Sequence, residues 1–585
     1  MEAGVKHSSV DAKKSQNVSK DPDQTPDLIL GAITQNHDIL ATKHYTDDAR
    51  HPAEWSRHSR WRYVPEIQML NWWEPPTEEE KMLVKDYLTS KGYPVKLNYV
   101  YGYGVGIREN KELVMEGEVL ATDLEAFIRD MIRGSEWEGK VFAVGGFTRD
   151  ELMGKTPKDL DVVVNELQGG IKFTTWLAKK LNIFKENSNP VTFPTFGTAN
   201  LRLTGVVHNG IDFSSEEIDA VMPRAEQYHD STRKPSAVQF TTLDDDAKRR
   251  DLTINSIYKN ISTGELLDPA GGQEDIKKKI IRTASNPDLI YTDDALRMFR
   301  AIRFASQLEF NIDPEIISSI KRNLNRLHNT SKERIRDELN KILKTNNPDY
   351  GIKLLRDTGL LQYVAKELQQ AVGMTQNVHH TEDVFDHTMS VLRKTKPELI
   401  QRLMALFHDI GKVATRSETP SGVHFYGHEN AGVEIVDRIM RELKYPTDLI
   451  NAVKLGVKNH MRLKGGGDTA INLSDKALRK FKIELGDQLE NILNVIHADN
   501  TAHASASSMP NQIDNVRQRL ANLDIQVSKP NLPITGKDLM GLGLKPGPLF
   551  SDIFSKITDA WFSNPNITRE EALEIAKQIS GTYNK

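Results

Sequence analysis

Short apolar runs alternate with polar turns between residues 117 and 272, a pattern typical of interleaved strands and helices. The run Val141–Val144 predicts a buried strand, which the pair Gly145 and Gly146 ends. Helices are predicted over 119–133, 148–153 and 171–184, and further strands over 159–164, 200–206 and 218–221. This part of the chain is therefore expected to form one mixed α/β domain.

From residue 273 onward the apolar positions recur mainly at helical spacing. A helix is expected over 292–308, with Thr292 as its N-cap. Further helices are expected within 315–370, around His387, before His408 and over 569–579. The second half of the chain is therefore expected to be all-α.

Composition places the chain among ordinary folded proteins. It has 585 residues, of which 38% are hydrophobic and 27% charged, so several domains are expected. The net charge of −4 gives no global basic field, so any nucleic-acid binding must come from local patches. The absence of cysteine excludes disulfides and cysteine zinc sites, and it fits a cytoplasmic protein. No apolar run approaches the roughly 18 residues of a membrane helix, and the first residues lack a signal core.

The N-terminal part differs in composition from the rest. Residues 1–27 are polar and are expected to be disordered. Residues 28–116 hold four of the seven tryptophans, interleaved with arginines: Trp55, Trp61, Trp72 and Trp73. Such interleaving can bind single-stranded nucleic acid, although a small accessory fold is the simpler alternative. The role of this extension stays open.

Asp159 and Asp161 are two residues apart on a predicted strand, so their carboxylates share one face. Neighbouring carboxylates repel unless a cation lies between them, and Mg²⁺ held with phosphate oxygens is the usual one. The preceding glycine pair would let a phosphate approach the backbone. Asp219, on a later strand, is the candidate third carboxylate. Its competitors nearby are Asp212, Glu216 and Glu217. A solvated acidic strand is the alternative interpretation.

Side chains suited to a nucleoside triphosphate occur at Arg149 and in the stretch 248–256. Arginine offers forked donors that match phosphate oxygens, which makes Arg149 and Arg250 candidates. Asp251 or Asn255 could accept a hydrogen bond from a ribose hydroxyl. The alternative is a helix N-terminus with surface charges.

Asp294 and Arg297 are three residues apart on a predicted helix and would be neighbours on its surface. A carboxylate beside a guanidinium offers acceptors and donors in one plane, so the pair could read the edge of a base. Arg300 and Arg303 continue the arginine row. A simple ion pair within the helix is the alternative.

Histidines and aspartates concentrate after residue 377. The candidate ligands are His387, His408, Asp409, His428, His460 and Asp499. Imidazole and carboxylate together suit Mn, Fe, Co, Ni or Mg ions. The adjacent pair His408-Asp409, followed by Gly-Lys at a helix end, favours a metal site over unrelated polar side chains.

These motifs resemble the class II tRNA nucleotidyltransferases, the bacterial CCA-adding enzymes, and their relatives the bacterial poly(A) polymerases. The resemblance runs collinearly from about residue 141 to 579. Its motifs are Gly145-Gly146 with Arg149-Asp150 and Asp159-x-Asp161, then 249–255, 268–272 and 294–297. The family usually has Glu-Asp where this chain has Asp293-Asp294, which leaves the role of Asp293 open. The His/Asp segment resembles the HD phosphohydrolase domain of some members.

The resemblance implies a multidomain chain, α/β followed by all-α. It implies a polymerase-β-like nucleotidyltransferase head with a mixed sheet over 117–272. A helical neck and body for nucleotide selection and RNA binding would follow over 273–370, then an HD domain over 371–505. A helical tail that binds tRNA would occupy 506–585.

The resemblance also implies template-independent addition of CCA to the 3′ end of tRNA from CTP and ATP, with the tRNA 3′ end and acceptor stem as the binding partner. Two Mg²⁺ ions would be held by Asp159 and Asp161, with Asp219 completing the site. The implied nucleotide-binding residues are Gly145, Gly146, Arg149, Arg250, Asp251, Asn255, Asp294, Arg297, Arg300 and Arg303. Asp294 and Arg297 would replace a template base and favour C and A over U and G. The HD domain would bind a divalent transition metal such as Ni²⁺ or Mn²⁺ and hydrolyse phosphate esters such as 2′,3′-cyclic ends.

Other functions stay open at this level. A poly(A) polymerase shares every head motif, and a CC-adding or A-adding specialist would share them too. From another class, the chain could be an HD phosphohydrolase with an inactive head. The sequence indicates no membrane partner and leaves the oligomeric state open.

Overall fold

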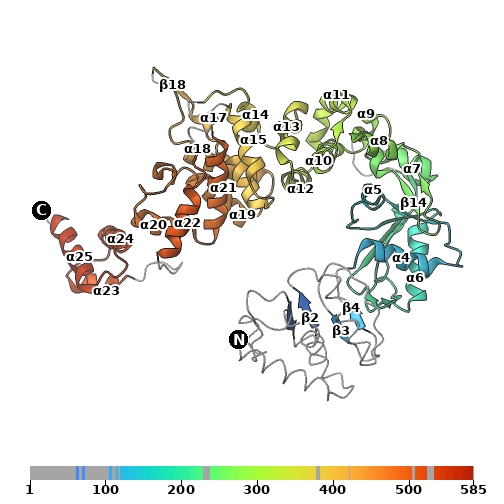
Figure 1. Cartoon of the computed structure of the whole chain (residues 1–585), viewed down its shortest axis with the longest axis horizontal. Helices are drawn as coiled ribbons and strands as arrows, with labels where there is room; N and C mark the ends of the chain where they lie inside the picture. Colours follow the sequence, from blue (N-terminus) through green and yellow to red (C-terminus); the bar gives the residue numbers. More distant parts are fainter. Residues whose placement is uncertain are drawn as a thin grey trace, which may run out of the picture. The chain divides into compact units, whose positions relative to one another are not determined.

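The computed structural model describes residues 119–227, 237–376, 382–420, 422–503, 508–523 and 532–583, and the backbone of four short strands before residue 119. These strands are β1 (Trp61–Val64), β2 (Met69–Trp72), β3 (Val105–Ile107) and β4 (Leu113–Met115). Residues 1–27, which were expected to be disordered, lie outside the described residues. Most of the extension, including Trp55 and Trp73, lies outside them too. The chain divides into two compact units, residues 1–278 with 283–285, and residues 279–282 with 286–585 (Figure 1).

A seven-stranded mixed sheet forms the centre of the first unit. Its strands, in spatial order, are β15 (Leu266–Leu267), β14 (Tyr258–Asn260), β5 (Val141–Val144), β6 (Asp161–Val164), β11 (Glu217–Val221), β8 (Thr198–Arg202) and β7 (Val191–Phe193). β6 and β11 run parallel, whereas the other adjacent pairs are antiparallel. The predicted mixed α/β domain and its first strand are therefore confirmed.

Helices cover both faces of this sheet, which explains why β5 is apolar at every position. The α-helices that the structure describes in this unit are α4 (Ala121–Ile132), α5 (Gly146–Leu152), α6 (Gly169–Lys180), α7 (Leu243–Arg249) and α8 (Gly272–Lys278). Val141 and Ala143 share one core with α4 and α6, whereas Phe142 and Val144 share another with α7. Because side chains alternate along a strand, a strand covered on both faces needs an uninterrupted apolar run.

Besides the pair β1–β2, two smaller sheets belong to the part of the first unit that the structure describes. One has the order β3-β4-β10-β9 and includes β9 (Val207–His208) and β10 (Ile211–Asp212); the other pairs β12 (Arg224–Gln227) with β13 (Ala237–Phe240). The predicted turn lies between β9 and β10, where Asn209 and Gly210 have positive φ angles of 50° and 80°. β4 lies in the N-terminal extension and pairs with β10 of the head. The extension and the head therefore share a sheet across the expected domain boundary at residue 117.

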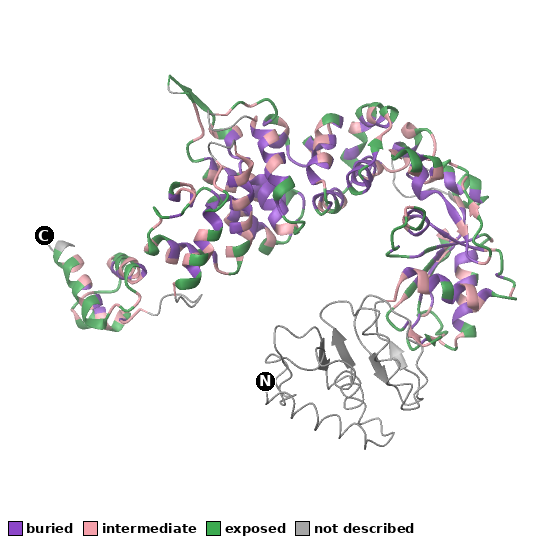
Figure 2. Ribbon diagram, viewed as in Figure 1, coloured by how far each residue is buried: buried purple, intermediate pink, exposed green. Residues whose placement is uncertain are grey.

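The second unit is mainly helical, and its buried residues lie on the inward faces of the helices (Figure 2). Its α-helices are α9 (Pro287–Asp293), α10 (Arg297–Leu308), α11 (Pro314–Asn323), α12 (Lys332–Leu343), α13 (Pro348–Thr358), α14 (Lys366–Gln370), α15 (Val384–Lys394), α16 (Leu399–Phe407), α17 (Lys412–Thr415), α18 (His428–Glu442), α19 (Thr447–Asn459), α20 (Asp475–Leu485), α21 (Leu489–Ala502), α22 (Gln512–Asn522), α23 (Gly536–Gly541), α24 (Pro548–Ser563) and α25 (Arg569–Tyr583). The short strands β16 (Ile280–Ile281) and β17 (Asn311–Ile312) pair, as do β18 (Ser417–Thr419) and β19 (Gly422–His424). The expected all-α character is confirmed apart from these short pairs.

The expectation of one helix over 292–308 is wrong at its beginning. Thr292 belongs to α9, where its hydroxyl donates to the Asp288 carbonyl instead of capping a new helix. Asp294 then adopts an extended backbone, and its carboxylate accepts from the Leu296 backbone N–H at 3.1 Å. This local side-chain bond favours a break before α10, because it competes with helical hydrogen bonding.

The tail helices α23, α24 and α25 share a small apolar core of their own. Its fully buried members include Leu539, Ile553, Ile557, Ala572 and Ala576. Within the described residues, no helix has both the length and the apolar character needed to cross a membrane.

Candidate active sites

Carboxylates of the first unit gather at one end of the central sheet. In the parallel pair β6–β11, Asp161 lies directly opposite Asp219, so both side chains leave the same face. Asp159 precedes β6 by two residues, and the three aspartates are exposed while the intervening Leu160 is buried. The strand was expected to begin at residue 159 but begins at Asp161, so the shared face of Asp159 and Asp161 stays a prediction, while the register places Asp219 beside Asp161.

An asparagine that the sequence analysis missed holds Asp219. Asn200 lies opposite Asp219 on β8, and its Nδ2 donates to Asp219 Oδ1 at 2.9 Å and to Glu217 Oε2 at 2.8 Å. The competitor Glu217 also accepts from Arg202 Nε at 2.9 Å. Asp212, another competitor, lies on β10 in a different sheet. Strand pairing therefore favours Asp219 as the third carboxylate.

The glycine pair lies next to these carboxylates. Val144, the last residue of β5, pairs with Asp161, and Gly145 follows it with a φ of 76°. A Cβ at Gly145 would lie 3.3 Å from Asp161 Oδ2, and the positive φ disfavours other residues. Glycine therefore leaves space beside the Asp161 carboxylate, as a phosphate group would require.

Three predicted nucleotide-binding residues form one buried network. Arg149 Nη1 donates to Asn255 Oδ1 at 2.8 Å, and its Nε donates to Asp150 Oδ1 at 2.8 Å. Asn255 Nδ2 in turn donates to Asp251 Oδ1 at 3.3 Å. The network connects α5 to the segment after α7, and Arg149 is only 4% exposed. Arg149 therefore braces the site from within, in addition to any contact with phosphate.

Asp246, which the sequence analysis did not single out, anchors the arginines that end α7. Its carboxylate lies 2.7 Å from Arg249 Nη2 and 3.1 Å from Arg250 Nε, and it accepts from the Tyr258 hydroxyl at 2.6 Å. Burial by itself would raise the pKa of Asp246, but the charges of Arg250 and Arg249 lower it to about 2. The sequence did contain a signal for this contact: Arg249 and Arg250 follow Asp246 by three and four residues, the spacing of neighbours on a helix surface.

Asp294 pairs with an arginine from another helix. Arg334, on α12, donates through Nη2 to Asp294 Oδ2 at 2.6 Å and through Nη1 to Asp294 Oδ1 at 3.1 Å. Arg297 Nη1 instead lies 3.5 Å from the Ile290 carbonyl oxygen and 3.9 Å from Asp293 Oδ2. The alternative of an ion pair between Asp294 and Arg297 is therefore wrong, because the two residues do not lie on one continuous helix: α9 ends before Asp294 and α10 begins at Arg297.

The other arginines of α10 differ in their surroundings. The Arg300 guanidinium lies 5.6 Å from the centre of the Phe304 ring. Arg303 is buried, and its Nε donates to the buried Glu338 carboxylate at 2.7 Å. Arg303 therefore ties α10 to α12, and its predicted role in nucleotide binding stays a prediction.

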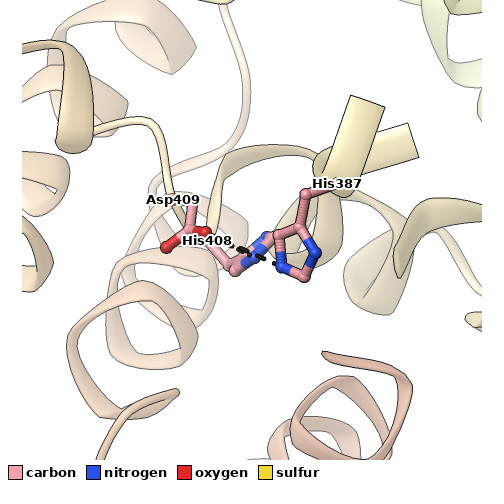
Figure 3. A group of neighbouring side chains, drawn as sticks. All are labelled: His387, His408 and Asp409. Carbon is pink, nitrogen blue, oxygen red and sulfur yellow. Dashed lines mark ion pairs between the residues drawn. The ribbon is translucent and has the colours of Figure 1, made fainter. Parts of the chain in front are cut away.

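The six predicted metal ligands of the second unit converge in its interior. They come from α15 (His387), the end of α16 (His408, Asp409), the start of α18 (His428), the end of α19 (His460) and α21 (Asp499). Each is at most 6% exposed. Figure 3 shows three of them, His387, His408 and Asp409, with their polar ends directed toward one another.

Asp409 lies at the centre of this cluster. Its Oδ2 is 3.2 Å from His408 Nε2 and 3.9 Å from His387 Nε2. Its Oδ1 is 3.3 Å from His428 Nε2 and 3.4 Å from His460 Nε2. One carboxylate therefore lies between two groups of imidazoles, an arrangement that suits two cations sharing Asp409.

The imidazoles are oriented by backbone carbonyl groups. Nδ1 of His408, His428 and His460 lies 2.8, 2.9 and 2.7 Å from the carbonyl oxygens of Ala405, Phe425 and Val457. A carbonyl only accepts, so Nδ1 carries a proton, and in the neutral imidazole that binds a metal Nε2 offers its lone pair toward the centre. The Nε2 atoms of His428 and His460 are 3.2 Å apart, so these lone pairs repel unless a cation binds them.

Two lysines and a further histidine surround the ligands. Lys412 Nζ lies 2.6 Å from Asp409 Oδ2, and Lys464 Nζ lies 2.9 Å from Asp499 Oδ2. Burial by itself would raise the pKa of both carboxyls. The charges of His408 and Lys412 instead hold the pKa of Asp409 well below its usual range, and the charge of Lys464 does the same for the pKa of Asp499. His503, which the sequence analysis did not single out, is four residues after Asp499. It lies near enough to His387 and Asp499 to share a metal with them.

Family models match three segments of the chain. The Poly A polymerase head domain matches residues 141–282. A model for the RNA and SrmB-binding site of polymerase A matches residues 309–372, and tRNA nucleotidyltransferase domain 2 matches residues 428–576. The first match contains the carboxylates and glycines at the end of the central sheet.

Full-length relatives extend this likeness. The chain is 31% identical over 335 residues to the A-adding tRNA nucleotidyltransferase of Deinococcus radiodurans, covering 54% of this chain and 75% of the relative. It is 30% identical over 355 residues to the Multifunctional CCA protein of Psychromonas ingrahamii, covering 58% and 79%. The fold is similar to that of the Bacillus stearothermophilus CCA-adding enzyme in complex with CTP, with a TM-score of 0.54, 21% identity, and coverage of 79% of this chain and 98% of that chain.

Proposed function

The chain belongs to the class II tRNA nucleotidyltransferase family, and we propose that it adds CCA to the 3′ end of tRNA from CTP and ATP. Membership in this family makes it an enzyme that transfers nucleotides. One observation carries the proposal for this chain: Asp161 and Asp219 lie side by side across β6 and β11, next to the turn at Gly145. This arrangement offers carboxylate ligands and space for a phosphate at the same place.

The donor set fits Mg²⁺, because carboxylate oxygens are the ligands that this ion prefers. Asp159, Asp161 and Asp219 would hold a pair of such ions, which would activate the tRNA 3′-hydroxyl and neutralise the departing pyrophosphate. Asn200 fixes one oxygen of Asp219, and Asp246 holds Arg250 for the triphosphate.

Asp294 and Arg297 are proposed to read the base. Cytosine and adenine both present an amino donor next to a ring nitrogen acceptor, whereas uracil and guanine present the opposite order. A carboxylate acceptor with a guanidinium donor matches the first pattern, so C and A would be favoured. Acting on tRNA, the protein is expected to work where tRNA matures, and we propose the cytoplasm.

The test is to sequence the 3′ ends of tRNA transcripts lacking CCA or its final A, after incubation with CTP, ATP and Mg²⁺. Completion to CCA followed by arrest is expected. A long run of A would identify a poly(A) polymerase instead. Addition of A only to ends that already carry CC, or arrest after CC, would identify a partial specialist. No addition to any transcript would contradict nucleotide transfer itself.

A second candidate function belongs to the His/Asp cluster of the second unit. We propose that it is an HD phosphohydrolase site, acting on phosphate esters such as 2′,3′-cyclic RNA ends, whose removal would restore the hydroxyl that nucleotide addition needs. The observation that favours it is Asp409 lying between His408, His428 and His460, with their Nε2 atoms directed at the centre. Lys412 and Lys464 add positive charge suited to a phosphate.

A divalent transition metal such as Ni²⁺ or Mn²⁺, bound by this ligand set, would supply Lewis-acid chemistry for hydrolysis. The test combines metal analysis of the purified protein with hydrolysis of 2′,3′-cyclic AMP and of p-nitrophenyl phosphate in added Ni²⁺, Mn²⁺ or Mg²⁺. Bound metal with turnover of the cyclic nucleotide is expected. Protein that contains no metal and hydrolyses neither compound would reduce the cluster to a structural role.

A further inference from the structure

Asp294 is held by a forked ion pair that the sequence does not reveal. Arg334 uses two guanidinium nitrogens on the two oxygens of Asp294, at 2.6 and 3.1 Å. The Leu296 backbone N–H donates to Oδ1 at 3.1 Å. These contacts join the turn between α9 and α10 to α12, and both side chains remain partly exposed, at 24% for Asp294 and 32% for Arg334.

The three contacts determine which acceptor Asp294 can still offer. A carboxylate has about four lone-pair directions, two on each oxygen. Arg334 takes one on each oxygen, and Leu296 takes the second one on Oδ1. Within the described residues, these contacts leave one acceptor direction on Oδ2, which is enough for one amino group of a base.

We propose that Arg334 is a positioning residue for nucleotide selection, an inference that rests on the proposed base-reading role of Asp294. By fixing the carboxylate plane, Arg334 directs the remaining acceptor of Oδ2 toward the exocyclic amino group of cytosine or adenine. The carbonyl oxygen of uracil or guanine at the same place would face a fixed acceptor and be repelled. Without Arg334 the carboxylate can rotate, so the acceptor loses its direction and discrimination falls.

The same unit contains a control for a purely structural role. Arg322, on α11, pairs with Asp288 at 2.9 Å and also ties α9 to a following helix. Asp288 lies in the first turn of α9, six residues before Asp294. Removing Arg322 therefore tests whether a looser α9 is enough to change selectivity.

The experiment measures kcat and KM for CTP, ATP, UTP and GTP with the full-length protein and tRNA ends that await C or A. Arg334→Ala is expected to reduce selectivity for CTP over UTP, and for ATP over GTP, by about tenfold, within the range of one lost bidentate contact. The KM for CTP and ATP is expected to rise more than kcat falls. Arg334→Lys keeps the charge and a single donor nitrogen and should recover part of the selectivity, whereas Arg322→Ala should match the parent.

Two comparisons decide the result. Unchanged selectivity in Arg334→Ala, or an equal loss in Arg322→Ala, overturns the inference. Asp294→Ala and Arg297→Ala run in the same assay: if these also retain full selectivity, the proposed base-reading role fails as well. If only those two variants lose selectivity, base reading stands and the role of Arg334 is refuted. Should Arg334→Ala not fold, by its melting temperature, Arg334→Lys and Arg334→Gln give the same comparison.

Discussion

Asp246 provides the buried negative charge beneath Arg249 and Arg250. Its side chain is almost fully enclosed and accepts from both arginines and from the Tyr258 hydroxyl. A buried carboxylate is stable in the charged form only when it is paired and hydrogen-bonded. The orientation of Arg250, a candidate triphosphate ligand, therefore depends on a residue that would not itself touch the nucleotide.

The pKa of Asp246 gives its contribution a defined pH range. A pKa lowered from 3.8 to about 2 corresponds to about 2 kcal/mol of stability at neutral pH. Because the folded pKa is the lower one, this contribution is present above about pH 4 and is lost as the pH falls toward 2. Asp246→Asn should lower the free energy of unfolding at pH 7, and its difference from the parent should shrink over that range.

Chemical denaturation of parent and variant between pH 7 and pH 2.5 measures this effect. The neighbour Asp245 is an exposed carboxylate on the same helix turn, so Asp245→Asn is the matched control and should change stability little. Equal stability losses for Asp246→Asn and Asp245→Asn would contradict the assignment.

A second prediction at the residue scale concerns the carboxylates at the end of the central sheet. Asp159→Ala or Asp161→Ala should reduce nucleotide addition at least about 100-fold, because metal positioning is lost. tRNA binding should persist, because phosphate contacts carry most of the affinity. CTP incorporation and a gel-shift titration measure the two properties. Asp212→Ala, in the separate sheet, serves as the control, and near-normal incorporation by either site variant would disprove the assignment.

At the scale of elements, the site depends on how closely α6 approaches β11. Gly170 lies in the first turn of α6, where an added Cβ would be 2.2 Å from the Ala220 carbonyl oxygen and 2.6 Å from that of Gly197. Ala220 follows Asp219 on β11, so the helix packs against the strand that carries the third carboxylate. A small residue at one helix position thus sets the position of the strand that carries Asp219.

Gly170→Ala should therefore have two effects. Overpacking should destabilise the protein by about 1–3 kcal/mol, because the contact is with rigid backbone. The displaced β11 should also lower CTP incorporation, by moving Asp219 relative to Asp161. Thermal unfolding and incorporation assays measure these effects, with Gly541→Ala as control because nothing lies within 4 Å of a Cβ there. A variant with the parent's melting temperature would show that the helix has room to move.

At the scale of the whole molecule, the two candidate metal sites lie in different compact units. The head carboxylates lie in the first unit, exposed at the end of its central sheet, whereas the His/Asp cluster is buried in the interior of the second. Two chemistries built on separate cores are expected to be separable by mutation, because neither ligand set contributes to the other.

The double substitution His408→Ala with Asp409→Ala tests this separation. It should abolish metal binding and ester hydrolysis by the second unit, and it should leave nucleotide addition within about twofold of the parent, because substitutions at independent sites that share no partners do not couple. Metal analysis and 3′-end sequencing measure the two outcomes. His424→Ala, on β19 and outside the metal ligand groups, is the control. Loss of nucleotide addition at unchanged melting temperature would show that the units depend on each other.

The sequence by itself predicted most of the elements and the residue types of both candidate sites. Val141–Val144 was predicted as a strand because burial on both faces requires a continuous apolar run, and His387 was placed on a helix because its neighbours repeat at helical spacing. Motifs of adjacent residues, such as His408-Asp409, were equally visible. These features are local, so a linear pattern carries them.

Only the tertiary structure decided which distant side chains meet. Strand register placed Asp219, rather than its three acidic neighbours, opposite Asp161. The helix is interrupted after α9, so Asp294 and Arg297 do not pair, and the packing of α12 brings Arg334 to Asp294 instead. These outcomes depend on register, helix ends and contacts between residues far apart in the chain, none of which has a periodic signature in the sequence.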